Sequence, residues 1–173
     1  MKTKLLSTMI AAGVIALSQN ALAADGTITF NGSITAQTCT INGGVAATNF
    51  TVTLPPVSSA SLASAGQTAG RTPFNIALTN CTGTGGNVHT YFEAGSTTDA
   101  SGNLNLDANG ATNVQLGLLN SDATAIKAGY ADASQNSKAV AITGGSATLS
   151  YFVQYVATGV ATAGAATSKV LYT

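Results

Sequence analysis

The sequence predicts an all-β protein, an antiparallel β-sandwich. Short runs with apolar residues at every second position recur along the chain, and clusters of Gly, Asn, Ser and Asp separate them. Successive side chains of a strand point to opposite faces, so this alternation is typical of half-buried strands. Short strands with turn signals between them are typical of a sandwich. No convincing amphipathic helix is predicted after the first 23 residues.

The first 23 residues have the three parts of a secretory signal peptide. Lys2 and Lys4 form a basic start, residues 5–17 are mostly apolar, and Ala21-Leu22-Ala23 supplies the small residues before a cleavage site. The apolar run is too short for a comfortable membrane span. Cleavage would make Ala24 the first mature residue and leave 150 residues, which suits one domain with a real core.

Charge is sparse in this chain. Asp, Glu, Lys and Arg make up 7% of the residues, and loss of Lys2 and Lys4 would leave four basic and six acidic side chains, a net charge of −2. Proteins that bind nucleic acid need a basic face, so no nucleic-acid partner is expected. A free monomer usually stays soluble through surface charge, so this composition favours a subunit that is covered in an assembly.

The stretch from Asp25 to Ile34 alternates clearly at the start of the mature chain. Ile28, Phe30, Gly32 and Ile34 share one face, and polar residues share the other. A glycine within the apolar face is unusual, because a strand interior favours bulk. We therefore interpret this stretch as a strand whose apolar side chains and glycine match one specific binding site, which can lie in another molecule. An ordinary first strand with a bulge at Gly32 is the alternative.

Further extended segments are expected at residues 34–41, 50–54, 74–79, 88–94, 114–118, 125–127, 139–142, 148–156 and 165–172. Residues 58–70 and 95–113 are expected to be loops, because small and polar residues dominate them. Pro55 and Pro56 end the strand at 50–54, since proline cannot donate to a ladder. The segment 148–156 is apolar on both faces, which predicts a central strand.

The two cysteines, Cys39 and Cys81, are most simply a disulfide in an exported protein. Such a bond would tie the end of the strand at 74–79 to the first part of the mature chain. Two free thiols are the alternative. A metal site built on this pair lacks further ligands, since His89 is the single histidine.

Groups that could carry catalysis are few. A Ser-His-Asp arrangement would have to use His89, whose place at a strand start is also typical of a solvated side chain. The acidic residues are scattered, and no spacing nominates a glycosidase pair. We therefore expect no catalytic site, no metal and no cofactor.

Two other stretches have a functional and a structural interpretation. Residues 99–107 carry oxygen ligands at alternate positions, loosely like a calcium loop, but lack its glycine and closing glutamate. A loop of Asx-turns is the better account. The aromatic residues of 148–156 could form a platform for sugars, but packing in the core is favoured.

Four blocks of the sequence together resemble the type 1-type fimbrial (pilin) subunits of the bacterial chaperone–usher pathway. The blocks are residues 26–34, Thr38-Cys39-Thr40-Ile41, Asn80-Cys81 and the tail at 164–172. Their order and spacing carry the resemblance over the whole mature chain. It implies an incomplete immunoglobulin-like sandwich that lacks its last strand, with a donor-strand extension at 24–34 and a pilin domain at 35–173.

The resemblance also implies how such a subunit works. Ile28, Phe30, Gly32 and Ile34 would be the donor strand that fills the apolar groove of a neighbouring pilin subunit, with Gly32 where the groove is shallow. This mode of assembly is β-strand addition. The product would be a surface fimbria, most simply a homopolymer, that supports cell adhesion.

The acceptor side and the export partners are implied in the same way. Gly164, Ala166, Val170 and Tyr172 would lie on the side of the C-terminal strand that faces the chaperone and the groove. Export through the periplasm would need a periplasmic chaperone and an outer-membrane usher. Such a subunit is not an enzyme.

The C-terminus departs from the family pattern. Members commonly carry a glycine fourteenth from the end and a penultimate tyrosine. Tyr172 is penultimate here, but Val160 is fourteenth from the end and Gly164 is tenth. A chain with about four further residues after Thr173 would restore the pattern, so truncation at this end is expected.

Two rival functions follow from the residues alone. A self-contained secreted lectin-like domain would pair its first strand within its own chain and stay a stable monomer. A secreted hydrolase would depend on His89 or on one of the acidic residues.

Overall fold

The computed structural model describes residues 38–42, 44, 49–83 and 85–173, which belong to one compact unit, Thr35–Thr173. The signal peptide and the donor stretch predicted above lie outside the described residues. The strands are β1 (Thr40–Ile41), β2 (Thr68–Thr79), β3 (Asn87–Val88), β4 (Leu104–Asn105), β5 (Val114–Asn120), β6 (Ala125–Ile126), β7 (Val140–Ala141) and β8 (Ala147–Ala157). One turn of 3-10 helix, η1 (Ser59–Leu62), and one of α-helix, α1 (Asp132–Gln135), complete the described elements.

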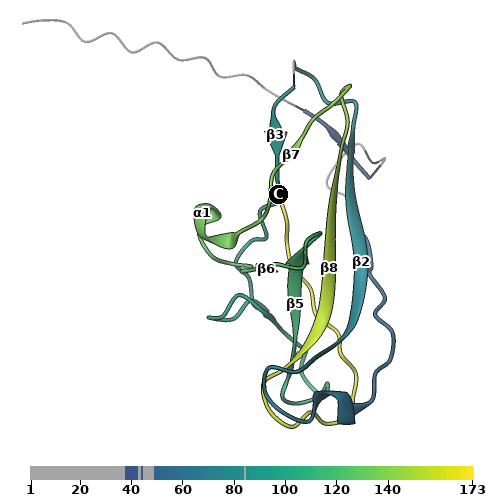
Figure 1. Cartoon of the computed structure of the whole chain (residues 1–173), viewed down its shortest axis with the longest axis vertical. Helices are drawn as coiled ribbons and strands as arrows, with labels where there is room; N and C mark the ends of the chain where they lie inside the picture. The colour runs from purple at the N-terminus through teal and green to yellow at the C-terminus, as the bar shows by residue number, and fades with distance from the viewer. Residues whose placement is uncertain (1–37, 43, 45–48, 84) are drawn as a thin grey trace, which may run out of the picture. The chain divides into compact units, whose positions relative to one another are not determined.

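The main sheet is antiparallel and has the order β1-β2-β8-β5-β4, with β6 paired to β5. The long strands β2, β8 and β5 lie side by side in Figure 1. A second sheet pairs β3 with β7. The predictions of an antiparallel all-β fold and of a central strand at 148–156 are confirmed, because β8 has a partner along both edges.

The core lies against one face of the main sheet. Leu149, Tyr151, Val153 and Tyr155 alternate along β8 and are between 2% and 8% exposed. The Tyr151 ring packs on Phe74, with 5.5 Å between ring centroids. These tyrosines therefore belong to the core, as favoured, and form no platform for sugars.

Strand β2 begins earlier than predicted. Residues 68–70 were expected to be loop because small and polar residues dominate 58–70, but Thr68 and Ala69 pair with β8. The register shifts between Ala69 and Thr72, and Gly70 has φ +64° within that irregularity. A Cβ at Gly70 would lie 2.8 Å from the Tyr155 ring. The glycine therefore permits a bulge and a close approach inside a longer strand.

Other segments pair less than their alternation predicted. Residues 88–94 form a ladder only at β3 and a single bridge between Phe92 and Tyr172. The expected loop at 95–113 contains the short strand β4. Cys39 and Cys81 form the predicted disulfide, next to the pairing of Thr40 with Thr79. Among the described residues, no helix is long and apolar enough to cross a membrane.

Candidate functional site

The C-terminal segment, residues 164–173, is extended and hydrogen-bonded along one edge. Its odd-numbered carbonyl groups are the acceptors: Ala165 from Ala111 N (2.7 Å), Thr167 from Asp107 N (2.7 Å), Lys169 from Thr97 Oγ1, Leu171 from Glu93 N (2.9 Å), and Thr173 from Tyr91 N (2.8 Å). Backbone groups of successive residues point to opposite sides of a strand. One edge of this segment is therefore used within the chain.

The opposite edge of the same segment is open. Within the described part of the chain, the backbone groups of Ala166, Ser168 and Val170 make no hydrogen bond. The side chains of Ala166, Val170 and Tyr172 are half-buried and pack against the core. The structure thus places these three predicted residues on the inward face of a strand that has one unused edge.

Gly164 stands where this segment passes the backbone of residues 110–111. A Cβ at Gly164 would lie 2.7 Å from Ala111 N and 2.9 Å from its Cα, closer than real Cβ contacts. Any side chain there would push the segment away from the loop that supports it. Gly164 therefore sets a close approach of two backbones, a role that its place in the sequence did not reveal.

A second open segment runs from residue 49 to residue 57. The predicted strand at 50–54 has the expected alternation, with Val52 and Leu54 half-buried and Thr51 and Thr53 exposed. It is nevertheless not part of a ladder, and no backbone hydrogen bond of residues 49–57 occurs in the described chain. Alternation fixes which face is apolar, but a ladder also requires a neighbouring strand.

Segment 49–57 and the C-terminal segment are linked near both ends. The rings of Phe50 and Tyr172 meet edge to face, with centroids 5.9 Å apart. At the other end, Ala161 N donates to Leu62 O at 3.0 Å. Between these contacts, no backbone hydrogen bond links the two segments. Unpaired edges beside apolar side chains are a template for a strand of another chain.

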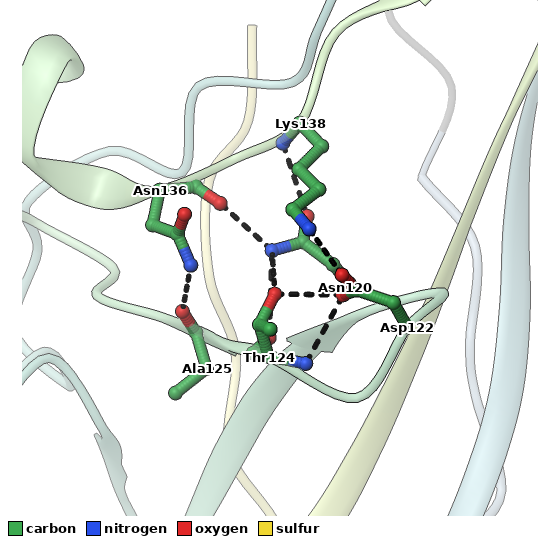
Figure 2. A network of polar contacts seen from close by, with 6 residues as sticks. All are labelled: Asn120, Asp122, Thr124, Ala125, Asn136 and Lys138. Carbon is green, nitrogen blue, oxygen red and sulfur yellow. Dashed lines mark hydrogen bonds and ion pairs between the residues drawn. The ribbon is translucent and has the colours of Figure 1, made fainter.

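A polar network lies elsewhere, around Asn120 (Figure 2). Asn120 is 1% exposed, and its Nδ2 donates to Thr124 Oγ1 (3.0 Å) and Asn136 O (2.7 Å) while its Oδ1 accepts from Lys138 N (3.0 Å). Asp122 forms an ion pair with Lys138. The hydrogen bond from Lys138 lowers the pKa of Asp122 to about 2. These groups satisfy one another, so the network joins β5 and β6 to the chain after α1.

The residues considered for catalysis and calcium have structural partners. His89 Nε2 lies 2.7 Å from Asp132 Oδ1, and both side chains are at least one-third exposed. Asp99 Oδ1 accepts from Ser101 N at 2.9 Å, which is the predicted Asx-turn. Although burial opposes the shift, hydrogen bonds from Ser101, Gln115 and the Asn103 backbone lower the pKa of Asp99. Among the described residues, no three His, Cys, Asp or Glu side chains are placed to hold a metal ion.

Two surface hollows have volumes of about 150 and 160 Å³. Sites for small organic ligands usually measure 300–1,000 Å³. The described surface therefore favours recognition of another chain along an open edge over capture of a small ligand in these hollows.

Residues 54–173 match the family model described as type-1 fimbrial protein A. Over 174 aligned residues the chain is 52% identical to the major fimbrial subunit SMF-1 of Stenotrophomonas maltophilia, covering 95% of this chain and 98% of the relative. It is 49% identical to the F17 fimbrial protein of Escherichia coli, covering 93% of each.

Solved structures agree with these relatives. A type I fimbria protein and antigen of Burkholderia pseudomallei is similar with a TM-score of 0.56 and 35% identity, covering 85% of this chain and 94% of that one. The P pilus rod subunit PapA has the same fold, with a TM-score of 0.58 at 16% identity over 78% of this chain and 96% of its own.

The fold and these relatives define the class: this protein is a structural subunit of a cell-surface fimbria, and it polymerises with other pilin subunits. The chain belongs to the type-1 fimbrial protein A family.

Proposed function

We propose that the subunit polymerises by donor-strand exchange, in which residues 24–34 of one copy occupy the open edges of the next. The observation that carries this proposal is the backbone of Ala166, Ser168 and Val170, which has no hydrogen-bond partner in the described chain although the side chains beside it face the core. A strand from a second copy would pair with these groups and cover the apolar side chains.

The predicted donor residues would bring apolar side chains to the open edges. Ile28, Phe30 and Ile34 would bury apolar side chains, each worth roughly 1.5–3 kcal/mol when fully covered. Gly32 would face a place where the acceptor leaves no room for a side chain. The assignment of donor residues comes from their alternation in the sequence, since they lie outside the described residues.

The open edges would also determine what export of the subunit requires. Before assembly, the open edges would expose unpaired backbone groups and apolar side chains together, which is an aggregation hazard. A periplasmic chaperone would cover them until an outer-membrane usher adds the next subunit. The assembled protein would be non-enzymatic, and its work would be mechanical support of adhesion.

The test is the size and form of the exported protein with and without residues 24–34. We expect the chaperone-bound subunit to form fibres in electron micrographs only when these residues are present. Phe30→Asp should block growth, because it places a charge on the apolar face. Thr29→Asp is the matched control on the polar face and should still polymerise.

A self-contained lectin-like domain would give a different result. Gel filtration would then show a compact, stable monomer with or without residues 24–34, and no chaperone would be required. That outcome would overturn strand exchange.

A further inference from the structure

Gln135 is a fully buried polar side chain that the assembly mechanism above does not use. It closes the single turn α1 and is 0% exposed. Its Nε2 donates to Phe92 O at 2.6 Å and to Tyr130 O at 3.0 Å, and its Oε1 accepts from Phe92 N at 3.0 Å. Both backbone groups of Phe92 are therefore bound by one side chain.

Phe92 lies at the centre of the segment that supports the C-terminal strand. On either side of it, Tyr91 N donates to Thr173 O at 2.8 Å and Glu93 N donates to Leu171 O at 2.9 Å, while Thr173 N donates back to Tyr91 O at 3.0 Å. Because backbone groups alternate, the groups of Phe92 point to the other edge. That edge is where Gln135 binds.

A primary amide can take the place of a peptide group here. It offers a donor and an acceptor together, as a residue of a neighbouring strand would. The described partners of the Phe92 backbone are this amide and Gly129 N, which donates to Phe92 O at 2.9 Å. Gln135 thus completes an edge at Phe92 that no strand of the described residues covers.

The chain around Gln135 fixes the position of its amide. Gln135 O accepts from Lys127 N at 2.9 Å. The next residue, Asn136, is left-handed with φ 63° and ends the helical turn. Phe92 is held from the core side, since its ring meets Tyr151 edge to face with centroids 5.4 Å apart. Side chain and backbone of Phe92 are therefore both fixed.

We propose that Gln135 is a positioning residue for strand capture: its amide replaces a neighbouring strand at Phe92 and so holds residues 91–93 in the register that supports the C-terminal strand. Because the outer edge of that strand is the proposed acceptor, Gln135 acts on assembly without touching the donor. This inference rests on the proposed function.

The test compares two buried amides. Gln135→Met keeps the approximate volume and removes the hydrogen bonds to Phe92. Gln154→Met does the same on β8, where Gln154 Oε1 accepts from Arg71 Nε at 3.1 Å and the described bonds of the amide do not involve residues 91–93. Both full-length chains carry Phe30→Asp to silence their own donor strand and are purified as chaperone complexes. The probe is a synthetic peptide with the sequence of residues 24–34, and its rate of uptake is measured beside thermal unfolding.

We expect both variants to unfold at lower temperature and only Gln135→Met to capture the peptide about tenfold more slowly or more weakly. Hydrogen exchange at the amides of Tyr91, Glu93 and Thr173 should rise in the same variant and stay unchanged in Gln154→Met. Equal peptide uptake by Gln135→Met and the parent chain at a temperature where both are folded would overturn the inference. Failure of the parent chain to take up the peptide would instead overturn strand exchange itself.

Gln135→Glu provides a second variant if the first does not fold. A protonated carboxyl group can both donate and accept, whereas a carboxylate can only accept. Peptide uptake by Gln135→Glu should therefore approach that of the parent near pH 5 and fall as the pH is raised to 8. The same pH profile for both chains would contradict the proposed role of the amide.

Discussion

The central strand β8 and the C-terminal segment 164–172 have similar alternating sequences and different surroundings. Strand β8 has a ladder along both edges, and its inward side chains Leu149 and Tyr151 are 2% exposed. The C-terminal segment is bonded along one edge, and its inward side chains Val170 and Tyr172 stay half-buried. The first region is completed by its own chain. The second follows the same alternation and has one edge without backbone partners among the described residues.

This difference separates two uses of apolar side chains. Burial inside β8 contributes to the stability of the isolated domain. Apolar side chains beside an unpaired edge contribute fully only when a strand from another molecule covers them. Substitutions in the two regions should therefore affect different measurements, and the predictions below test that separation in order of decreasing effect.

The disulfide gives the largest expected effect on the self-contained region. Replacing Cys39 and Cys81 by serine removes a cross-link between residues 42 apart, which the loop-entropy model equates with about 4 kcal/mol of unfolding free energy. Urea denaturation of the chaperone-free, peptide-bound domain should show this loss. Peptide uptake per folded molecule should not change, and a large change there would mean that the two regions are not separate.

A core truncation in β8 should have the second-largest effect on the unfolding free energy. Leu149→Ala removes a side chain that is 2% exposed and should lower the unfolding free energy by about 3 kcal/mol, within the range for buried leucines. Val170→Ala, in the open segment, should cost the isolated domain less than about 1 kcal/mol and yet weaken peptide capture. If Leu149→Ala and Val170→Ala changed the unfolding free energy and peptide capture to the same extent, the separation of the two regions would be contradicted.

The ion pair between Asp122 and Lys138 should have the smallest effect. Its side chains are about half exposed, and such pairs contribute little because solvent and salt screen them. The pKa of Asp122 is lowered to about 2, so its contribution is complete above the unfolded pKa of about 3.9 and is lost as the pH falls through 2. Any difference in melting temperature between Asp122→Asn and the parent at pH 7 should therefore shrink as the pH falls below about 3.9 and vanish only below pH 2, and a difference that stays constant over this range would exclude the pair as its cause.

The sequence predicted the faces of the strands better than their partners. The alternation of β8 and its two-sided apolarity predicted a central strand, and the presence of two cysteines in an exported chain predicted their bond. The same alternation at 50–54 predicted a ladder that is absent, because pairing depends on a neighbour that local sequence does not specify. Gly70 was placed in a loop because of the small and polar residues before it, whereas a bulge and the Tyr155 ring require a glycine there inside β2.

Only part of the open edge could be predicted from the sequence. Ala166, Val170 and Tyr172 were assigned through family resemblance; their side chains pack against the core, and their role as an acceptor stays a prediction. Gln135 gave no signal, since a glutamine in a polar stretch is usually solvated. Its role depends on tertiary contacts that bring residue 135 to residue 92.

The most direct measurement mixes two full-length variants, one without a working donor strand and one without a working acceptor edge. Phe30→Asp should lose its donor strand and keep its acceptor edge. Val170→Lys should lose the acceptor edge and keep its donor, while Leu171→Lys, on a side chain that is 65% exposed, serves as the matched control and should still form fibres. Donor and acceptor would be different surfaces, so the proposal expects the intact subunit to grow head to tail.

We expect neither variant alone to polymerise, and their mixture to give a discrete one-to-one dimer in gel filtration without fibres in electron micrographs. The donor of the Val170→Lys chain would occupy the edge of the Phe30→Asp chain, and growth would stop there. Fibres formed by either variant alone, or a mixture that yields no dimer, would contradict assembly through this edge.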